Sequence, residues 1–216
     1  MTKESRLKLT EIFRSLQGEA DTVGIPTVFV RLTGCPLRCH YCDTAYAFHG
    51  GQWWTLPEIL ARVAELEVRH VCVTGGEPLA QAAVHELLAA LCDVGYRVSL
   101  ETSGAMSLER VDPRVVKVVD IKTPASGEES RNRYDELARL DQKDLLKFVI
   151  ADRTDYEWSR EQLKARALSE RCTVLFSPSH QQLKAGDLAD WILEDRLPVR
   201  FQIQLHKYLW GDVPGR

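Results

Sequence analysis

The stretch HVCVTGGEPLAQAAVHELLAALCDVGYRVSLE, residues 70–101, decides the fold class of this chain. Two short runs that are typical of strands, His70–Thr74 and Tyr96–Glu101, flank a longer window, Ala80–Val94, in which leucines recur at helical spacing. A strand, a helix and a second strand in this order predict a right-handed crossover between two parallel strands. The stretch therefore indicates an α/β protein.

The same alternation continues on both sides of residues 70–101. Further strands are expected at Lys8–Phe13, Thr27–Leu32, Val115–Ile121, Leu145–Ile150, Thr173–Phe176 and Val199–Ile203. Further helices are expected at Leu56–Leu66, Arg131–Leu140, Tyr156–Leu168 and Ala185–Leu193. A closed barrel takes eight strand–helix units in about 250 residues, and this chain of 216 residues holds fewer. We therefore predict an incomplete, open parallel β/α barrel in a single domain, residues 1–216, whose first two strands form an added N-terminal hairpin.

Composition and charge exclude several classes of function. Lys and Arg total 28 against 31 Asp and Glu, a net charge of −3, so the chain does not resemble a protein that coats nucleic acid. It has no apolar run near the roughly 20 residues of a membrane helix, and residues 1–8 are polar, unlike a secretory signal. We expect a cytoplasmic protein with neither nucleic acid nor membrane as a partner. The six cysteines then need a role other than disulfides.

Three of the cysteines form the run Cys35-Pro-Leu-Arg-Cys39-His-Tyr-Cys42, directly after an expected strand. Zinc is one possible occupant, with His40 or His49 as a fourth ligand. An iron–sulfur cubane is the other, with three thiolates bound and one iron open to an exogenous ligand. The spacing alone does not separate the two. The isolated cysteines at 72, 92 and 172 are expected to be small buried hydrophobes.

Polar motifs follow the next three expected strands. They are Thr74-Gly75-Gly76-Glu77-Pro78, Glu101-Thr102-Ser103-Gly104 and Asp120-Ile121-Lys122-Thr123-Pro124. Ligands of parallel α/β proteins bind beyond the carboxyl ends of the strands. Motifs that converge from consecutive strand ends on a thiolate loop favour a catalytic cluster over a structural zinc ion.

The run C-x3-C-x2-C with an aromatic residue inside it, followed by Gly-Gly-Glu-Pro, resembles the signature of the radical S-adenosylmethionine superfamily. The resemblance implies that Cys35, Cys39 and Cys42 hold a [4Fe–4S] cluster whose fourth iron takes the amino and carboxylate groups of S-adenosylmethionine. It also implies that an electron from the cluster splits the sulfonium to give a 5′-deoxyadenosyl radical, which abstracts hydrogen from the substrate. In such enzymes the protein orients the cofactors and excludes water.

Four segments are similar to the 7-carboxy-7-deazaguanine synthase family: FRSLQGE at Phe13–Glu19, FVRL at Phe29–Leu32, CDT at Cys42–Thr44 and HKY at His206–Tyr208. That family converts 6-carboxy-5,6,7,8-tetrahydropterin into 7-carboxy-7-deazaguanine with loss of ammonia, for the biosynthesis of queuosine, a modified tRNA base. The resemblance implies a homodimer that requires Mg²⁺ and takes electrons from a donor protein such as a flavodoxin. One departure is Ala20, where the family often has glycine, so the loop has less backbone freedom.

The resemblance also implies roles for individual residues. Contacts to S-adenosylmethionine are expected from Tyr41, Cys42, Asp43, Gly76, Glu101, Lys122, Ser177, Pro178, Ser179 and His180. The substrate is expected to contact Leu16, Gln17, Gly18, Glu19, Arg31 and Thr74, and Mg²⁺ is expected to bind Thr44. The guanidine-like edge of the pterin suits the Glu19 carboxylate, and the pterin carboxylate suits the Arg31 guanidinium.

Other interpretations of the same residues stay open. Arg31, within an apolar strand, also fits a structural ion pair or a solvent-facing edge, and Thr44 alone suggests a turn cap. For the whole chain, a glycyl-radical-enzyme activase shares the cysteine run, although LQGE and CDT are not expected in it. The non-enzymatic alternative is a zinc-stabilised binding module, which would bind one zinc ion and would not need Gly75-Gly76.

Overall fold

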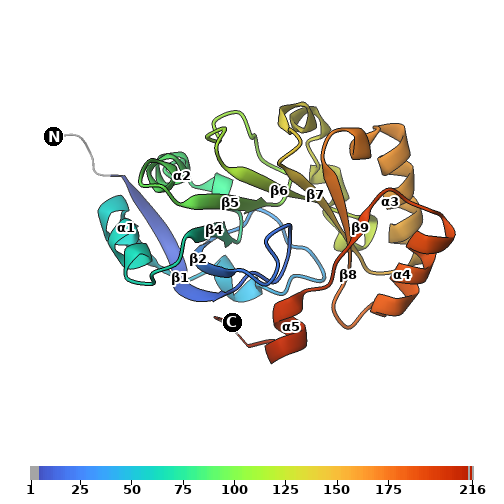
Figure 1. Ribbon diagram of the computed structural model, residues 1–216, viewed down its shortest axis with the longest axis horizontal. Coiled ribbons are helices and arrows are strands. Elements are labelled where there is room, and N and C mark those ends of the chain that lie inside the picture. Colours follow the sequence, from blue (N-terminus) through green and yellow to red (C-terminus); the bar gives the residue numbers. More distant parts are fainter. Residues whose placement is uncertain (1–4, 214, 216) are drawn as a thin grey trace.

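The computed structural model describes residues 5–213 and residue 215, and it places nine strands in one sheet (Figure 1). They are β1 (Arg6–Leu16), β2 (Pro26–Leu32), β3 (Gln52–Thr55), β4 (His70–Gly75), β5 (Arg97–Thr102), β6 (Val116–Ile121), β7 (Leu145–Ile150), β8 (Thr173–Pro178) and β9 (Arg200–Phe201). Their order is β3-β1-β2-β4-β5-β6-β7-β8-β9. From β2 through β9 along this order the pairs are parallel, whereas β1 pairs antiparallel with both β2 and β3. Because β3 and β9 are the two ends of this order, the predicted open barrel with an N-terminal hairpin is confirmed.

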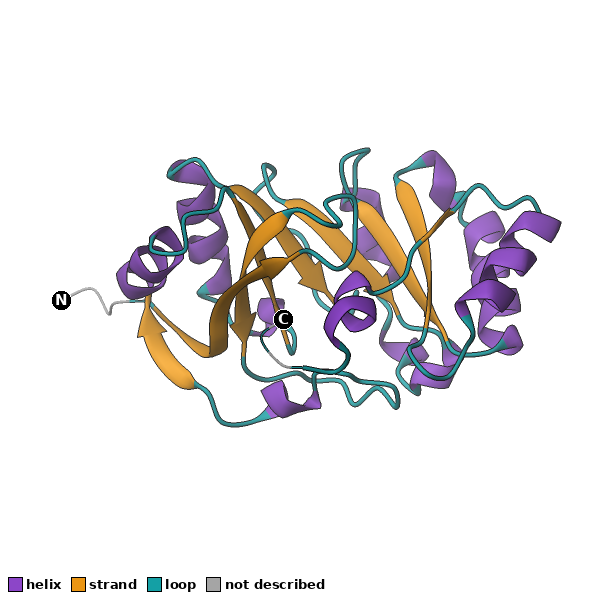
Figure 2. Cartoon of the chain, turned by 60° about the horizontal axis from the view of Figure 1, so that its bottom comes forward, coloured by secondary structure: helices purple, strands orange, loops and turns teal. Residues whose placement is uncertain are grey.

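Helices pack along the sheet, and one short helix lies apart from them. The α-helices of the described residues are α1 (Leu56–Ala64), α2 (Val84–Asp93), α3 (Arg153–Ala165), α4 (Ala185–Glu194) and α5 (Leu205–Trp210). Figure 1 shows α1 and α2 beside the strands of the N-terminal half, and α3 and α4 beside β7 to β9. Figure 2 brings α5 to the front, away from those four. None of these helices is long and apolar enough to cross a membrane.

The alternation of side chains along β7 shows how the sheet separates core from site. Leu146, Phe148 and Ile150 are fully buried in the main core, which they share with residues of α3 and α4. The residues between them, Lys147 and Val149, point to the opposite face and line a cavity. The helix-covered face therefore stabilises the fold, and the inner face carries the polar groups.

The window Arg131–Leu140, expected to be an α-helix, is not one. It forms 3-10 turns at Glu129–Arg131 and Tyr134–Arg139. The Asn132 side chain accepts a hydrogen bond from Lys122 N at 2.9 Å and donates one to Lys122 O at 2.8 Å. The buried Glu136 carboxylate accepts one from Leu108 N at 2.9 Å. These contacts with distant segments hold the backbone in shorter turns, and helical spacing in the sequence does not reveal them.

Two elements, β3 and α5, lie outside the expected ones. β3 pairs with the start of β1, with Trp53 opposite Lys8, and α5 has only six residues. The sequence predicts a helix from Tyr156, but α3 begins at Arg153, because the Asp152 side chain accepts a hydrogen bond from Asp155 N at 2.8 Å as an N-cap. Short elements and helix ends depend on single contacts of this kind.

Ala20, the departure from the family pattern, has a left-handed backbone with φ +64°. Its side chain is 2% exposed and packs with Val118, Leu145 and Leu175. The left-handed conformation costs an L-residue about 1–2 kcal/mol, and burial of a methyl group contributes about 0.8 kcal/mol in the opposite direction. The strain at this position is therefore partly offset by packing.

We expect Ala20→Gly to change the free energy of unfolding by less than about 0.5 kcal/mol, because relief of strain is offset by the lost methyl group and by glycine's freedom in the unfolded chain. Ala20→Val should destabilise the fold by about 2 kcal/mol, since a branched side chain neither suits a positive φ nor fits the filled cluster. Urea unfolding of the cluster-free protein measures both. A stabilisation above about 1 kcal/mol in Ala20→Gly would show that methyl burial contributes nothing here.

Candidate active site

A cavity of about 450 Å³ lies at the carboxyl ends of the parallel strands. It is lined by side chains from the β1–β2 connection, the cysteine loop, the ends of β4 to β7, the segment after β8, and α5. The residues that we assigned to the cluster, cofactor, substrate or metal and that line it are Leu16, Gln17, Gly18, Glu19, Arg31, Cys35, Cys39, Tyr41, Cys42, Asp43, Thr44, Thr74, Gly76, Glu101, Lys122, Ser179 and His180. The convergence of strand-end motifs on one place is thus present in the structure.

Ser177 and Pro178 do not line this cavity. Both still belong to β8, where they pair with Val149 and Ile150 of β7 and are buried. Ser177 lies opposite Val149, which lines the cavity, so its side chain is on the cavity-facing side of the sheet, and the contact expected from this segment stays a prediction.

The three clustered cysteines face the cavity as half-buried free thiols. Burial raises the pKa of each thiol, that of Cys39 to about 11. A metal centre that takes these groups as thiolates must displace their protons. Outside the cavity lining, Cys72 and Cys172 are buried and Cys92 is partly buried against the core, as expected of small hydrophobes.

The Gly-Gly-Glu motif after β4 packs directly against the cysteine loop. A Cβ atom on Gly76 would collide with the carbonyl oxygen of Gly34, so only glycine allows this approach. Glu77 N donates to the same carbonyl at 2.8 Å. The Glu77 carboxylate, which is fully buried, accepts hydrogen bonds from Leu79 N, Thr102 Oγ1, Ser103 N and Ser103 Oγ. Glu77 therefore joins the ends of β4 and β5 rather than facing a ligand.

The donor set fits an iron–sulfur cluster better than a zinc ion. Within residues 5–213 and 215, no three His, Cys, Asp or Glu side chains lie close enough together to hold one metal ion. His40 Nδ1 is instead 3.2 Å from Ala125 O, and the ring of His49 lies edge-on to Phe48. In a cubane each thiolate binds a different iron, so thiols of one loop that face the same cavity but are too far apart for a single ion still suit it.

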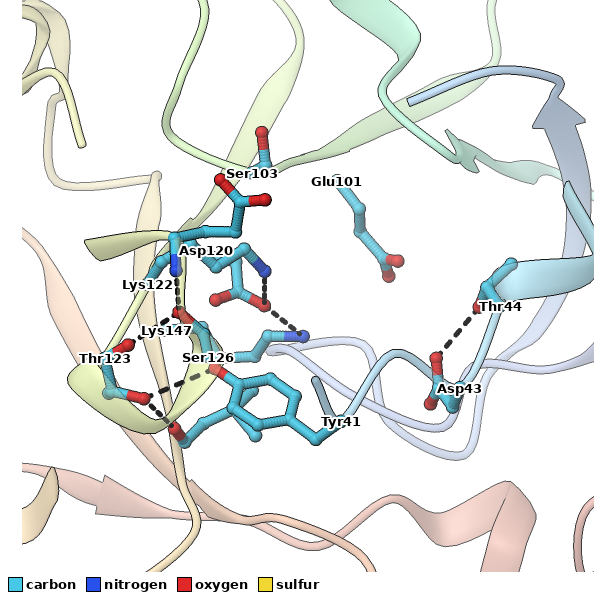
Figure 3. Close-up of polar contacts among 12 residues, drawn as sticks. Tyr41, Asp43, Thr44, Glu101, Ser103, Asp120, Lys122, Thr123, Ser126 and Lys147 are labelled. Carbon is cyan, nitrogen blue, oxygen red and sulfur yellow. Dashed lines mark hydrogen bonds and ion pairs between the residues drawn. The ribbon is translucent and has the colours of Figure 1, made fainter. Parts of the chain in front are cut away.

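Charged residues of β6 and β7 and of the segment after β6 line the cavity near Tyr41 of the cysteine loop (Figure 3). Lys122 and Lys147 both lie against Asp120, with Nζ–Oδ2 distances of 3.3 and 3.5 Å. Lys147 also bonds Glu19 at 2.7 Å. Burial alone would lower the pKa of Lys122, but Asp120 and the nearby Cys39 and Tyr41 hold it above its ordinary value. Both lysines therefore stay charged.

Two further polar groups are held in place near this row. The Glu101 carboxylate accepts a hydrogen bond from Thr74 Oγ1 at 2.9 Å and lies 3.4 Å from Gln17 Nε2. The Tyr41 hydroxyl lies 3.3 Å from Thr123 Oγ1, and burial raises the pKa of Tyr41 to about 12. These contacts join Thr74 and Gln17, both expected to bind the substrate, to Glu101, which is expected to bind S-adenosylmethionine.

Arg31 makes the structural ion pair that remained open as an alternative. Its Nε donates to Glu11 Oε1 at 2.7 Å, and its guanidinium lies over the rings of Phe13 and Tyr46. The side chain is nevertheless 15% exposed and lines the cavity. Because the ion pair with Glu11 uses Nε, the two terminal nitrogens of the guanidinium can bind a carboxylate ligand. Such a ligand and Glu11 then do not compete for the same atom.

Thr44 is not the turn cap that its sequence suggests. It precedes the 3-10 turn Ala45–Phe48, but its side chain makes no capping hydrogen bond. The hydroxyl donates to Asp43 Oδ1 at 2.9 Å (Figure 3). Burial alone would raise the pKa of Asp43, but Lys207, Gln204 and Thr44 together hold it well below its ordinary value. An ionised carboxylate and a hydroxyl therefore stand side by side at the cavity.

The C-terminal segment and Lys147 were missed as site residues. Gln204 Nε2 bridges Glu19 Oε1 at 2.9 Å and Asp43 Oδ2 at 3.0 Å. His206 packs so closely on Gly18 that a Cβ atom there would overlap its ring. The HKY motif carries the family resemblance, but the sequence alone gives it no role. Lys147 has a local signal, a lysine inside the apolar run LLKFVI, which is of the same kind as the arginine in the apolar strand around Arg31.

Comparisons with known proteins agree with this geometry. Residues 29–119 match the model of the Radical SAM superfamily. The 7-carboxy-7-deazaguanine synthase of Chlorobaculum tepidum is 43% identical over 214 residues, 98% of this chain and 97% of that protein. That of Koribacter versatilis is 44% identical over 219 residues, 94% of this chain and 97% of that protein.

A solved structure shows the same fold. The crystal structure of QueE from Escherichia coli has a TM-score of 0.77 and 23% identity, and the match covers 93% of this chain and 95% of that one. The long, near-complete matches to the two curated relatives carry the assignment of family. This chain belongs to the 7-carboxy-7-deazaguanine synthase family of the radical S-adenosylmethionine superfamily.

Proposed function

We propose that this protein is a 7-carboxy-7-deazaguanine synthase of queuosine biosynthesis, which contracts the ring of 6-carboxy-5,6,7,8-tetrahydropterin and releases ammonia. The observation that supports this most strongly is the single cavity in which the three cysteines, the LQGE loop and Arg31 meet. The curated relatives, named for this activity, match almost the whole chain. In class, the enzyme is a carbon–nitrogen lyase in one domain.

The cysteine side of the cavity is proposed to hold the cofactors. Cys35, Cys39 and Cys42 would bind the [4Fe–4S] cluster. When bound, the reduced cluster and S-adenosylmethionine supply hydrogen-atom abstraction from the substrate. The chain would position S-adenosylmethionine through Tyr41, Asp43, Gly76, Glu101, Lys122, Ser179 and His180, all of which line the cavity. Ser177 and Pro178, at the end of β8, would complete this contact surface.

The opposite side is proposed to bind the pterin. The Glu19 carboxylate would accept from the guanidine-like edge, and Arg31 would pair with the pterin carboxylate. Gln17 O already accepts from Gly24 N at 2.7 Å, and Gly18 O from Leu205 N at 3.0 Å. Each carbonyl keeps one lone pair for the substrate, and the hydrogen bonds hold the loop still. Leu16 and Thr74 would complete this contact surface.

The remaining partners follow from the proposed chemistry. A one-electron reduction requires an electron donor, for which a flavodoxin is suited, and an oxygen-sensitive cluster suits the reducing cytoplasm. We also propose a homodimer. Exposed apolar side chains of the kind that interfaces use include Trp53 (58%) and Tyr208 (79%).

The proposed function is tested by a direct assay. The protein is reconstituted anaerobically with iron and sulfide and incubated with S-adenosylmethionine, Mg²⁺, a reductant and 6-carboxy-5,6,7,8-tetrahydropterin. We expect 7-carboxy-7-deazaguanine, detected by mass, and an equal amount of ammonia. S-adenosylmethionine should not be consumed in proportion to product. Cleavage of S-adenosylmethionine without any deazaguanine would reject the substrate and keep only the superfamily.

Thr44 is proposed to bind Mg²⁺ together with substrate oxygens and water, since a hard cation accepts a hydroxyl oxygen. Thr44→Val should therefore raise the Mg²⁺ concentration for half-maximal turnover by about tenfold. Thr44→Ser, which keeps the hydroxyl and its hydrogen bond to Asp43, should stay close to wild type. A magnesium titration of product formation measures both, with S-adenosylmethionine affinity as the control. An unchanged midpoint and amplitude in Thr44→Val would remove Thr44 as a ligand.

A further inference from the structure

Four charged side chains form an alternating row along one wall of the cavity. In order they are Lys122, Asp120, Lys147 and Glu19, joined at 3.3, 3.5 and 2.7 Å. Each is between 11% and 16% exposed. Figure 3 shows Lys147 reaching from β7 toward Asp120 of β6, with Lys122 on the far side of the same carboxylate. The row runs from a residue proposed for the cofactor to one proposed for the substrate.

Lys147 occupies a position where a lysine is costly to bury. It lies in the middle of β7, opposite Asp120 of β6 and Leu175 of β8. Leu145, two residues earlier on the same face, belongs to a small apolar cluster. An ammonium loses several kcal/mol of hydration at such a site, and only well-placed partners offset that cost. Stability alone therefore gives little reason for a lysine here, because an apolar residue would pack as well.

The closest partner of Lys147 is the carboxylate expected to recognise the pterin. Glu19 Oε2 receives Lys147 Nζ at 2.7 Å and Gln202 Nε2 at 3.3 Å, and Glu19 Oε1 receives Gln204 Nε2 at 2.9 Å. A carboxylate accepts about four hydrogen bonds. The three protein donors therefore leave one acceptor position, on the side chain that lines the cavity. Lys147 supplies the only charge among these donors.

The electrostatics of the pair agree with this geometry. Burial alone would raise the pKa of Glu19, but Lys147 and Gln204 hold it below its ordinary value. Burial alone would lower the pKa of Lys147, but Glu19, Asp120 and Glu101 hold it well above its ordinary value. Both groups are therefore charged when the pterin arrives, and Glu19 is an acceptor rather than a donor.

We propose, on the basis of the function proposed above, that Lys147 is a positioning residue for the pterin: held between Asp120 and Glu19, its ammonium fixes the Glu19 carboxylate as the acceptor for the guanidine-like edge. Lys147 acts through Glu19 and through no other group of the substrate site. Loss of Lys147 then weakens substrate binding and leaves the cofactor side of the cavity able to bind S-adenosylmethionine.

A second buried lysine provides a matched control. Lys117 of β6 pairs with Asp144 at 2.8 Å, with side chains 6% and 0% exposed, and neither residue lines the cavity. Lys117→Met and Lys147→Met therefore both remove the nearest cation of a buried carboxylate, at two places in one sheet, although Asp144 keeps Lys143 Nζ at 3.7 Å. Both should reduce stability. Only Lys147→Met should change the binding of the pterin.

The experiment measures binding to the anaerobically reconstituted protein with S-adenosylmethionine present and no reductant, so that no turnover occurs. In Lys147→Met, we expect the dissociation constant for 6-carboxy-5,6,7,8-tetrahydropterin to rise about tenfold to hundredfold. The dissociation constant for S-adenosylmethionine should stay within about twofold, too small a change to represent a lost hydrogen bond. Lys117→Met should match wild type for both ligands despite a lower melting temperature.

A double variant separates positioning through Glu19 from an independent role. Glu19→Gln combined with Lys147→Met removes both charges of the pair, which favours folding if the single lysine variant does not fold. If Lys147 acts through Glu19, the double variant binds the pterin as weakly as Glu19→Gln alone and no weaker. A further tenfold loss in the double variant would overturn the proposal, as would normal pterin binding in Lys147→Met. Wild-type protein that neither binds nor converts the pterin would instead reject the proposed function, and this inference with it.

Discussion

Replacing Cys35, Cys39 or Cys42 with alanine is expected to abolish cluster binding, S-adenosylmethionine cleavage and product formation together. A cubane normally has four thiolate ligands, and this chain presents three of them at the cavity. Loss of one leaves two, and two irons would lack a protein ligand. The effect on activity is therefore complete rather than graded, while the cluster-free fold should keep its stability within about 1 kcal/mol because the three thiols are only half-buried.

Cys72→Ala and Cys172→Ala are the matched controls for this prediction. Both thiols are buried outside the cavity lining, so their loss removes no cluster ligand. Cys172→Ala is the cleaner control, because the Cys72 thiol also interacts with Gln17 and Glu101. We expect about 1 kcal/mol of destabilisation and a full complement of iron and sulfide. Metal analysis with visible and electron paramagnetic resonance spectra measures the cluster, and 5′-deoxyadenosine measures cleavage. An intact cluster in Cys39→Ala, or one zinc and no iron in wild type, would contradict the assignment of the cysteines.

The parts of the site that lie at strand ends were predictable from the sequence. Parallel strands bring their carboxyl ends to one edge, so motifs after β4, β5 and β6 must meet whatever the details of packing. Thr74, Glu101 and Lys122 line the cavity for this reason. The cysteine loop follows β2, whose neighbour in the sheet is β4, and it joins them by the same rule.

The missed parts depend on contacts between distant segments. Gln204 and Lys207 reach Asp43 because the chain after β9 returns across the cavity, a path that no local pattern encodes. Lys147 faces the cavity by the alternation along β7, but its contacts with Asp120 and Glu19 come from distant segments. Family resemblance predicted residues that would touch ligands, and it did not point to Lys147.

Glu77→Gln is expected to destabilise the fold by about 2–4 kcal/mol and to weaken binding of S-adenosylmethionine, although Glu77 does not line the cavity. Glu77 Oε1 accepts from Leu79 N at 3.0 Å and Thr102 Oγ1 at 2.8 Å, and Oε2 accepts from Ser103 N at 2.7 Å and from Ser103 Oγ. The hydroxyls of Thr102 and Ser103 can rotate to accept a hydrogen bond from a glutamine NH₂. The backbone N–H groups of Leu79 and Ser103 can only donate. Each orientation of glutamine therefore sets its NH₂ against one backbone N–H.

The consequences should reach the cofactor side through two connections. Ser103, which loses a charged acceptor, lines the cavity at the end of β5. The backbone of Glu77 also holds the cysteine loop through its 2.8 Å hydrogen bond to Gly34 O. We expect the dissociation constant for S-adenosylmethionine to rise about tenfold, because the end of β5 and the cysteine loop, which would both contact it, lose their alignment. Urea unfolding of cluster-free protein and titration of reconstituted protein measure the two effects separately.

Glu136→Gln is the control for this last prediction. Glu136 is also a buried glutamate that joins distant segments, but one of its oxygens accepts from Ser107 Oγ at 3.0 Å and the other from Leu108 N at 2.9 Å. A glutamine there can direct its oxygen to the backbone N–H and its NH₂ to the hydroxyl, so only its ion pairs with Arg133 and Arg139 are lost. Those arginines are more than 40% exposed, and the cost should be about 1 kcal/mol, with normal binding of S-adenosylmethionine. Equal effects of the two substitutions would mean that the lost negative charge, and not the fixed direction of two backbone N–H groups, explains the role of Glu77.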